Sequence, residues 1–338
     1  MKILLAVFFA ASMFVWTAPA QAFSPLMQEA RALTSAKNFK KAAELLEQVV
    51  AMEPTNAAAY NELAWSQMEI GQHKEALASA RRSVELDPSQ AMSYSNLGWA
   101  LTELGQFDEA VTVLQTALKL NPSLYLPWNN LGWAYLKLGR DDDALDAFKE
   151  AVRINPYYAK SYGNMSTIYF RTGRYAEAAE VLEKLVRMEP GKPGFYGGLG
   201  AAYMNLGQHA KAVFAFQEFV RLEPKDLQGW RNLAVSQLAS GKKDDAVATL
   251  KQLLVMKPRD FDSLDMLGMA YYQTGRYDEA IAALKEALEV KPDSERAVMS
   301  LAMTYIGKGD RDSARTLLPR LKELDDNLAS ILEKALSK

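Results

Sequence analysis

The sequence predicts an all-α protein, a solenoid of about nine helix pairs that repeat every 34 residues. Three residue types carry this prediction, because proline, glycine and alanine each recur at that step in one common register. Chance does not produce three such series together. The prolines are Pro54, Pro88, Pro122, Pro156, Pro190, Pro224, Pro258 and Pro292; the glycines are Gly71, Gly105, Gly139, Gly173, Gly207, Gly241, Gly275 and Gly309; the alanines are Ala42, Ala76, Ala110, Ala144, Ala178, Ala212, Ala246, Ala280 and Ala314.

Each repeat is numbered so that its proline is position 32. The first unit is degenerate, because Lys37 stands where position 15 of the other units has glycine. Irregular end units are typical of repeat arrays, whose outermost pairs face solvent. The units are 23–56, 57–90, 91–124, 125–158, 159–192, 193–226, 227–260, 261–294 and 295–328, and residues 329–338 form a C-terminal cap.

Two amphipathic helices are expected in every unit. In the first, bulky residues at positions 4, 7 and 11 and a small residue at position 8 follow the spacing of a helix about 14 residues long. Glycine at position 15 ends this helix by adopting the left-handed conformation. A second helix then runs from near position 18 to position 30, and the proline at position 32 cannot continue it.

Two motifs, Leu-Gly-Trp-Ala-Tyr at 131–135 and Gly-Arg-Tyr-Asp-Glu-Ala at 275–280, resemble the tetratricopeptide repeat (TPR), and the pattern covers residues 23–328. The resemblance implies a right-handed superhelix of stacked antiparallel helix pairs. Positions 2, 5, 6, 9, 12 and 13 of the first helix lie opposite its packed face. In the family, that opposite face lines a concave groove where partner peptides bind.

The last unit departs from the pattern. Pro319 falls inside its second helix and is expected to kink or break it. Asp326 replaces the proline at position 32, so the helix is expected to continue towards Ala335. The tail would then cover the last exposed face with Leu328, Ile331, Leu332, Ala335 and Leu336.

Residues 1–22 are predicted to be a secretory signal peptide. Lys2 precedes an apolar run at 3–16 that is too short to span a bilayer, and small residues at 20–22 favour cleavage after Ala22. The mature protein would begin at Phe23 and be periplasmic or secreted, without stable membrane insertion. An uncleaved N-terminal anchor is the alternative.

Composition excludes several functions. The absence of cysteine rules out thiol nucleophiles, Cys-ligated zinc and disulfides, and two histidines offer little material for His-based catalysis. A net charge of −2 argues against nucleic acid as a partner. We therefore predict no catalytic residues, no metal site and no cofactor, with a protein or peptide as the partner.

Tryptophan occupies position 9 in three successive units, at Trp65, Trp99 and Trp133. A row on the groove face would offer large contact areas at little cost in rotamer entropy, as tryptophan does at binding hot spots. The alternative is that the rings wedge between neighbouring first helices as packing.

Asparagine recurs at position 6, at Asn96, Asn130, Asn164 and Asn232. An asparagine amide both donates to and accepts from a peptide backbone, so such a series resembles the asparagine ladder of some TPR grooves that hold extended peptides. Asparagine is also simply common at this consensus position. Phe170, at position 12 of the same face, completes the predicted binding residues.

The unit at 193–226 has four glycines in its first helix, Gly194, Gly197, Gly198 and Gly200. Each weakens a helix by about 1 kcal/mol relative to alanine. The cluster predicts either a hinge or shallow pocket for a bulky ligand group, or tolerated drift in a helix held by its neighbours.

These features together predict a non-enzymatic exported scaffold that binds an extended segment of a partner protein in the concave groove. Envelope assembly or secretion would be its setting. The alternative is a carrier or assembly factor for envelope polysaccharide, because an aromatic row also stacks on sugars. The sequence does not identify the partner or the oligomeric state.

Overall fold

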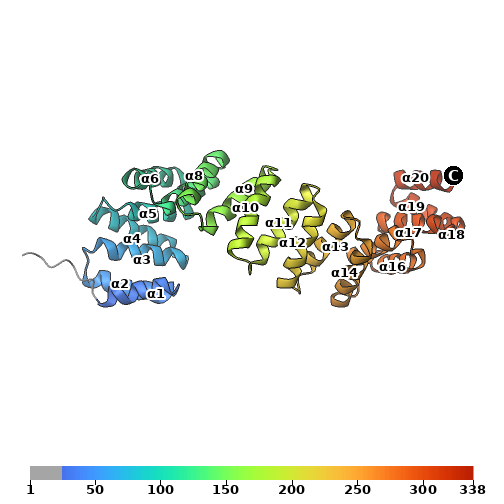
Figure 1. The fold of residues 1–338 in the computed structure, drawn as a ribbon, viewed down its shortest axis with the longest axis horizontal. Helices are drawn as coiled ribbons and strands as arrows, with labels where there is room; N and C mark the ends of the chain where they lie inside the picture. Colours follow the sequence, from blue (N-terminus) through green and yellow to red (C-terminus); the bar gives the residue numbers. More distant parts are fainter. Residues whose placement is uncertain (1–24, 338) are drawn as a thin grey trace, which may run out of the picture. The chain divides into compact units, whose positions relative to one another are not determined.

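A computed structural model describes residues 25–337, and within that range every regular element is an α-helix. The all-α solenoid predicted from the repeat is thus confirmed. The predicted signal peptide lies outside the described residues. None of the helices in the described range is both long and apolar enough to cross a membrane. The chain forms two compact units that divide between Ile154 and Asn155 (Figure 1). We call these two the first and second unit from here on, and refer to each 34-residue repeat as a pair or by its residues.

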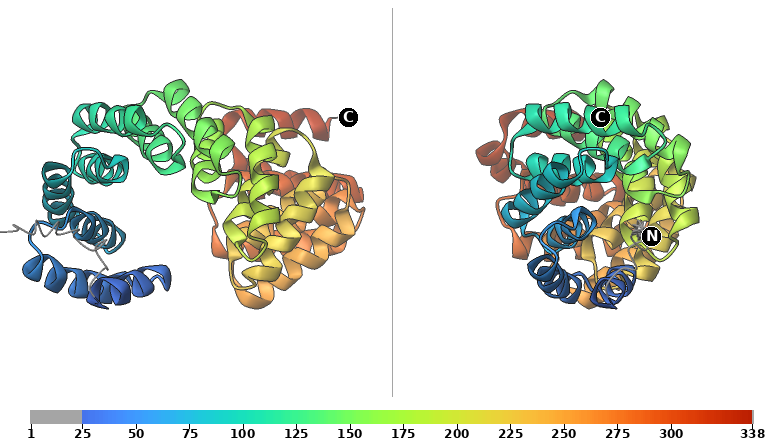
Figure 2. Two further views of the ribbon diagram at one scale, coloured as in Figure 1. Left: turned by 60° about the vertical axis from the view of Figure 1, so that its left-hand side comes forward. Right: turned by 90° about the vertical axis from the view of Figure 1, so that its left-hand side faces the viewer.

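The first unit contains four consecutive helix pairs. The blue-to-green helices in the left view of Figure 2 follow an arc. Successive first helices of the pairs contact one another, while the second helices make their main contacts with first helices. The first helices therefore line the inner side of the arc. The helices are α1 (Pro25–Ser35), α2 (Phe39–Met52), α3 (Ala57–Glu69), α4 (His73–Leu86), α5 (Ala91–Glu103), α6 (Phe107–Leu120), α7 (Tyr125–Lys137) and α8 (Asp141–Ile154).

The second unit contains the remaining pairs in the same alternation. Its helices are α9 (Ala159–Arg171), α10 (Tyr175–Met188), α11 (Pro193–Asn205), α12 (His209–Leu222), α13 (Leu227–Ala239), α14 (Lys243–Met256), α15 (Phe261–Gln273), α16 (Tyr277–Val290), α17 (Glu295–Lys308), α18 (Arg311–Thr316), α19 (Leu318–Leu324) and α20 (Asp326–Leu336).

The turn between the two helices of a pair has one geometry throughout. All eight position-15 glycines adopt φ between +68° and +90°, as their predicted role as helix terminators requires. In the second pair, Gly71 N–H donates to Met68 O and Gln72 N–H to Gln67 O, the double hydrogen bond of a Schellman motif. Lys37 takes the same role in the first pair at φ +58°, although it carries a Cβ.

The core of each pair depends on small residues at positions 8 and 20. All nine position-20 alanines, from Ala42 to Ala314, have no exposed surface. At position 8 the glycines lie directly under the position-24 side chain of the same pair. A Cβ on Gly98 would lie 2.3 Å from Leu114 Cγ, and one on Gly132 would lie 2.7 Å from the Phe148 ring. The two helices of a pair therefore approach more closely than larger residues would allow.

The glycine-rich helix α11 owes its composition mainly to packing. A Cβ on Gly197 would lie 3.1 Å from the Phe219 ring, and one on Gly200 would lie 2.7 Å from the Phe216 ring. A Cβ on Gly229 of the next pair would lie closer still, 2.3 Å from the Phe219 ring. The shallow pocket considered from the sequence is therefore wrong at these positions, because phenylalanine side chains fill the space.

The C-terminal end confirms one expectation and corrects another. Pro319 does break the last second helix, because α18 ends at Thr316 and Pro319 lies in the first turn of α19. The expected continuation towards Ala335 is wrong. Asp325 adopts an extended conformation and its carboxylate accepts hydrogen bonds from the backbone N–H groups of Asn327 and Leu328, so a new helix, α20, begins at Asp326.

The cap is consequently a separate helix, α20, that starts inside the last 34-residue repeat, 295–328. Leu332 and Leu336 of the expected apolar cover are buried against the final pair, together with Ala329, which was not among the expected residues. Ile331, which was expected to join that cover, is 52% exposed.

Lys37→Gly is expected to stabilise the first unit by about 1 kcal/mol, since the left-handed conformation is strained for a residue with a Cβ. Gly71→Ala is the matched reverse change, because Gly71 has φ +78° and open space around it. It should destabilise the unit by about the same amount. The midpoint of urea unfolding followed by tryptophan fluorescence measures both, and equal midpoints for the three proteins would refute the conformational role of position 15.

Gly229→Ala is expected to destabilise the second unit by about 1–3 kcal/mol, because the new methyl group overlaps the Phe219 ring. A second change, Phe219→Leu, should restore most of the loss. Gly194→Ala serves as the control, since nothing lies within 4 Å of its Cβ position. It should gain about 0.5 kcal/mol. Thermal unfolding followed by circular dichroism measures these effects, and a loss at Gly194 equal to that at Gly229 would favour the hinge.

Candidate functional site

The three position-9 tryptophans lie on consecutive first helices of the first unit, at the inner side of its arc. Trp65 is on α3, Trp99 on α5 and Trp133 on α7. Trp65 is 38% exposed, and the other two are half-buried. We call these three residues the tryptophan row. All three belong to one compact unit, so their arrangement follows from the packing of that unit.

Trp133 is held by two polar neighbours. Its Nε1–H donates to Glu103 Oε1 at 2.8 Å, which links α7 to α5. Lys137 Nζ lies 4.3 Å from the ring centroid, at cation–π distance. The indole therefore has a fixed orientation before any ligand arrives.

The other two rings combine packing with exposure. Trp65 lies against Phe39 of α2, with ring centroids 6.0 Å apart, and its Nε1–H donates to Glu69 Oε1 at 3.3 Å. Trp99 packs against the small buried cluster that contains Met68 and Ala76. Trp99 and Trp133 thus contact the preceding first helix, whereas Trp65 contacts the second helix α2, and all three rings keep exposed surface. A binding role for the row stays a prediction.

Asn96 and Asn130 are used between helices. Asn96 is 5% exposed, and its Nδ2 donates to Asn61 Oδ1 at 2.8 Å and to Asn61 O at 3.1 Å. Asn130 is 9% exposed, and its Nδ2 donates to Ser95 Oγ at 3.1 Å and to Ser95 O at 3.3 Å. Each amide joins its first helix to the preceding one. Contact of these two side chains with a peptide backbone stays a prediction, and little of their surface is available for it.

The remaining predicted residues belong to the second unit. Asn164 on α9 and Asn232 on α13 are half-buried, and Asn232 Oδ1 accepts a hydrogen bond from Gln228 Nε2 at 3.0 Å. Phe170 packs edge-to-face on Tyr175, with ring centroids 5.9 Å apart. The asparagine series is therefore shared between two units.

The Phe170 contact recurs within the same unit. Tyr272 and Tyr277 occupy the corresponding two positions of a later pair and are also 5.9 Å apart. Recurrence of the contact indicates that Phe170 packs the turn between its two helices. A binding role for Phe170 stays a prediction.

Carboxylates on the first helices form ion pairs with the neighbouring first helix. Glu62 Oε1 lies 2.6 Å from Arg31 Nε; burial raises the pKa of Glu62, and Arg31 opposes the shift. Asp265 Oδ2 lies 2.9 Å from Arg296 Nε, and burial likewise raises the pKa of Asp265. Each ion pair joins two neighbouring first helices, and its carboxylate is already neutralised by the arginine. We therefore assign these carboxylates to the stacking of the helices and not to ligand binding. No group of three or more acidic or histidine side chains in the range 25–337 is placed to hold a metal ion.

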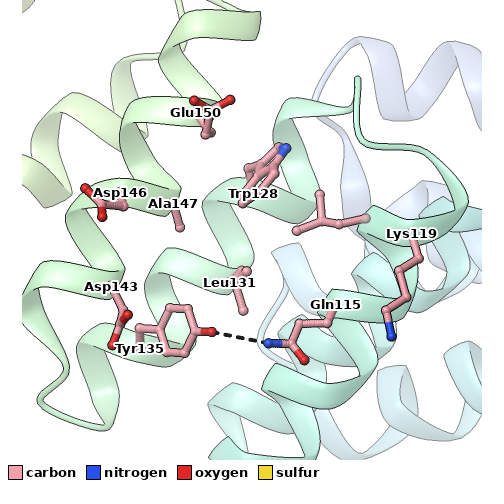
Figure 3. A pocket seen from close by; sticks show the side chains of 10 residues that line it. Gln115, Lys119, Trp128, Leu131, Tyr135, Asp143, Asp146, Ala147 and Glu150 are labelled. Atoms are coloured by element: carbon pink, nitrogen blue, oxygen red, sulfur yellow. Dashed lines mark hydrogen bonds between the residues drawn. The ribbon is translucent and has the colours of Figure 1, made fainter.

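A pocket that the sequence did not predict is lined by side chains of α6, α7 and α8 (Figure 3). Its α7 residues occupy positions 4, 7 and 11, on the opposite face of that helix from Trp133 at position 9. The pocket occupies about 560 Å³ between the second helices α6 and α8. Trp128 and Tyr135 of α7 form its aromatic part. Its walls come from α6 of one repeat and from α7 and α8 of the next, so the pattern of a single helix does not predict it.

Comparison with known protein families gives matches along most of the chain. A profile described as the C-terminal domain of cilia and flagella-associated protein 70 matches residues 166–329. One profile described as tetratricopeptide repeat matches residues 95–159, and another matches 33–97 and 135–193. No curated protein matches the sequence.

Several solved structures are similar to part of this chain. YrrB, described as a TPR protein with an unusual peptide-binding site, is 20% identical over 55% of this chain and 95% of its own, with a TM-score of 0.49. A MamA protein is 24% identical over 51% and 94%, with a TM-score of 0.47. MamA 41-end from Desulfovibrio magneticus RS-1 is 25% identical over 50% and 96%, also with a TM-score of 0.47. The repeat profiles and the uniform helix pairs lead to one conclusion: the chain is a tetratricopeptide repeat protein.

Proposed function

We propose that this protein is a non-enzymatic scaffold that binds an extended segment of a partner protein on the inner face of its first unit. The observation that carries the proposal is the tryptophan row, Trp65, Trp99 and Trp133, on three consecutive first helices. Partly exposed indoles at one register give a ligand several equivalent contacts along its length. Tryptophan is the residue most enriched at sites that dominate binding energy.

The row is prepared for binding by its polar neighbours. Glu69 and Glu103 accept hydrogen bonds from the indoles of Trp65 and Trp133, so these rings need little further ordering when a ligand arrives. At position 13 the charge changes from Glu69 and Glu103 to Lys137. This order favours a segment with apolar side chains between the rings, basic residues near α3 and α5, and an acidic residue near α7.

Export is part of the proposal. It rests on Lys2, the apolar run at 3–16 and the small residues at 20–22. In a periplasmic or secreted setting, a scaffold of this kind would serve envelope assembly or secretion. Binding of envelope polysaccharide by the same aromatic row is the competing function, and the experiments below separate the two.

The double variant Trp65→Leu, Trp133→Leu is expected to weaken binding of selected peptides at least about tenfold, since two aromatic contacts are lost. Peptides would be selected from a displayed library on the full chain and measured by calorimetry. Trp230→Leu is the control, because Trp230 occupies position 4 and its Nε1–H donates to Pro224 O. It should bind those peptides like the unchanged protein. Equal affinity of the double variant would contradict the proposal.

A photoreactive residue at position 65 tests the class of ligand in cells. Trp65 is the most exposed of the three rings, so a crosslinker there lies within reach of a bound segment. Mass spectrometry should identify a crosslinked protein. A glycan array with several strong signals, together with no protein crosslink, would instead support the polysaccharide carrier.

Cleavage after Ala22 predicts that the exported protein begins at Phe23. N-terminal sequencing of the protein purified from the envelope fraction measures this directly. Ala20→Arg should retain the uncleaved form, because a large charged residue replaces a small one beside the cleavage site. A protein that starts at Met1 and fractionates with membranes would show that the segment is an anchor.

A further inference from the structure

The pocket between α6 and α8 differs from the grooves at the same place in other repeats. Such a groove lies between the second helices of successive pairs and above the first helix of the later pair. In three of these grooves the chain supplies its own cation from position 25 of the earlier pair. Lys251 Nζ lies 5.6 Å from the Tyr271 ring centroid, Lys285 Nζ lies 6.0 Å from that of Tyr305, and Arg81 pairs with Glu109 at 3.2 Å.

Position 25 is Gln115 in the α6–α8 pocket, so no internal cation crosses it from that position. Gln115 Nε2 reaches only the hydroxyl of Tyr135, at 3.4 Å. Arg140 lies 4.5 Å from the centroid of the Tyr135 ring. In the later pair the corresponding Arg276 lies 4.6 Å from Tyr271, which also receives Lys251. The Tyr135 ring therefore has one neighbouring cation, Arg140, whereas the Tyr271 ring has two.

The walls of the pocket suit a cation with an apolar stem. Trp128 Nε1–H donates to Pro122 O at 3.0 Å, which fixes the indole, and Leu131 and Ala147 add apolar surface. Figure 3 shows Trp128 and Tyr135 between the carboxylates of α8 and the side chains of α6. An aromatic face in a recess attracts ammonium and guanidinium groups.

Three carboxylates and one ammonium line the pocket. Asp143, Asp146 and Glu150 follow one face of α8, opposite Lys119 of α6. Each carboxylate has an ion pair with a residue three positions away in the sequence, with Arg140, Lys149 and Arg153 respectively. These pairs are solvent-exposed and therefore weak, so a cation that enters the pocket competes with them for the carboxylates.

The combination occurs in this pair alone among the full repeats of the sequence. Only the repeat at 125–158 has tryptophan at position 4 with tyrosine at position 11, and only this repeat has acidic residues at positions 19, 22 and 26 together. A general requirement of the fold would place them in every repeat. The volume of about 560 Å³ also exceeds what a single side chain fills, which leaves room for neighbouring residues of a ligand.

We propose that this pocket is a second docking site, which takes an arginine or lysine side chain of a partner protein where other repeats place their own cation. The stem of that side chain packs on Trp128 and its charged end lies among Tyr135, Asp143 and Asp146. The site is on the opposite side of α7 from the tryptophan row and does not depend on binding there.

The test uses two capped pentapeptides, Gly-Leu-Arg-Leu-Gly and its analogue with neutral citrulline in place of arginine. They have the same shape and differ in charge. Binding to the full chain is followed through the indole N–H signals of the tryptophans in ¹⁵N NMR spectra. The arginine peptide should shift the Trp128 signal, the citrulline peptide should bind at least about tenfold more weakly, and added salt should reduce the difference.

Gln115→Lys should remove the site without disturbing the fold, because it supplies the internal cation that Lys251 provides elsewhere. We expect at least about tenfold weaker binding of the arginine peptide. Gln217→Lys is the matched control, the same change at the same repeat position of another groove, and it should leave the Trp128 shift unchanged. Asp146→Asn with Glu150→Gln should weaken binding as Gln115→Lys does.

Three results would overturn the proposal. Equal shifts with the citrulline peptide would indicate an apolar site. Unchanged binding by Gln115→Lys and by the carboxylate variant would show that the pocket is not where the peptide lies. Self-association in sedimentation runs that Gln115→Lys abolishes would make a second copy of the chain the occupant. Failure here leaves the tryptophan row untouched, since its variants are measured separately.

Discussion

Close approach of the two helices within each pair is the constraint on which the rest of this structure depends. Gly98 and Gly132 have no room for a Cβ because Leu114 and Phe148 of the partner helix lie directly on their backbone. The fully buried alanines at position 20 allow the same approach from the other helix. Once positions 8 and 20 are fixed inside the pair, position 9 is turned towards the inner face, and position 4 and position 11 towards the next groove. Both proposed surfaces follow from that geometry.

Local chemistry explains why so much of the fold was predictable. Proline, glycine and alanine each have a physical reason to occupy one place in a helix pair, and the first and second helices begin and end within a residue or so of the expected positions. Even Lys37, which lacks the glycine signal, ends its helix in the left-handed conformation. Pro319 acts as expected for the same reason, since its effect is confined to its own turn.

What the sequence left open depends on contacts between repeats. A single helical wheel places Asn96 and Asn130 on the groove face, yet their amides join neighbouring first helices, because position 6 lies where those helices meet. The α6–α8 pocket was missed because it is defined by Gln115 of one repeat and Tyr135 of the next. Aligning position 25 of each repeat with position 11 of its successor is the signal that would have found it. Asp325 is another position that the sequence pattern did not predict. Its side chain caps a new helix there, although the residues on both sides of it have a helical pattern.

The described tryptophans are unevenly shared between the two units: Trp65, Trp99, Trp128 and Trp133 are in the first, and Trp230 is in the second. Intrinsic fluorescence therefore reports mainly on one half of the chain, whereas far-ultraviolet circular dichroism sees helices of both. Each half has its own core of helix pairs, so the two signals need not change together during denaturation. The protein carries a built-in spectroscopic label that distinguishes cooperative unfolding of the whole array from stepwise loss of its halves.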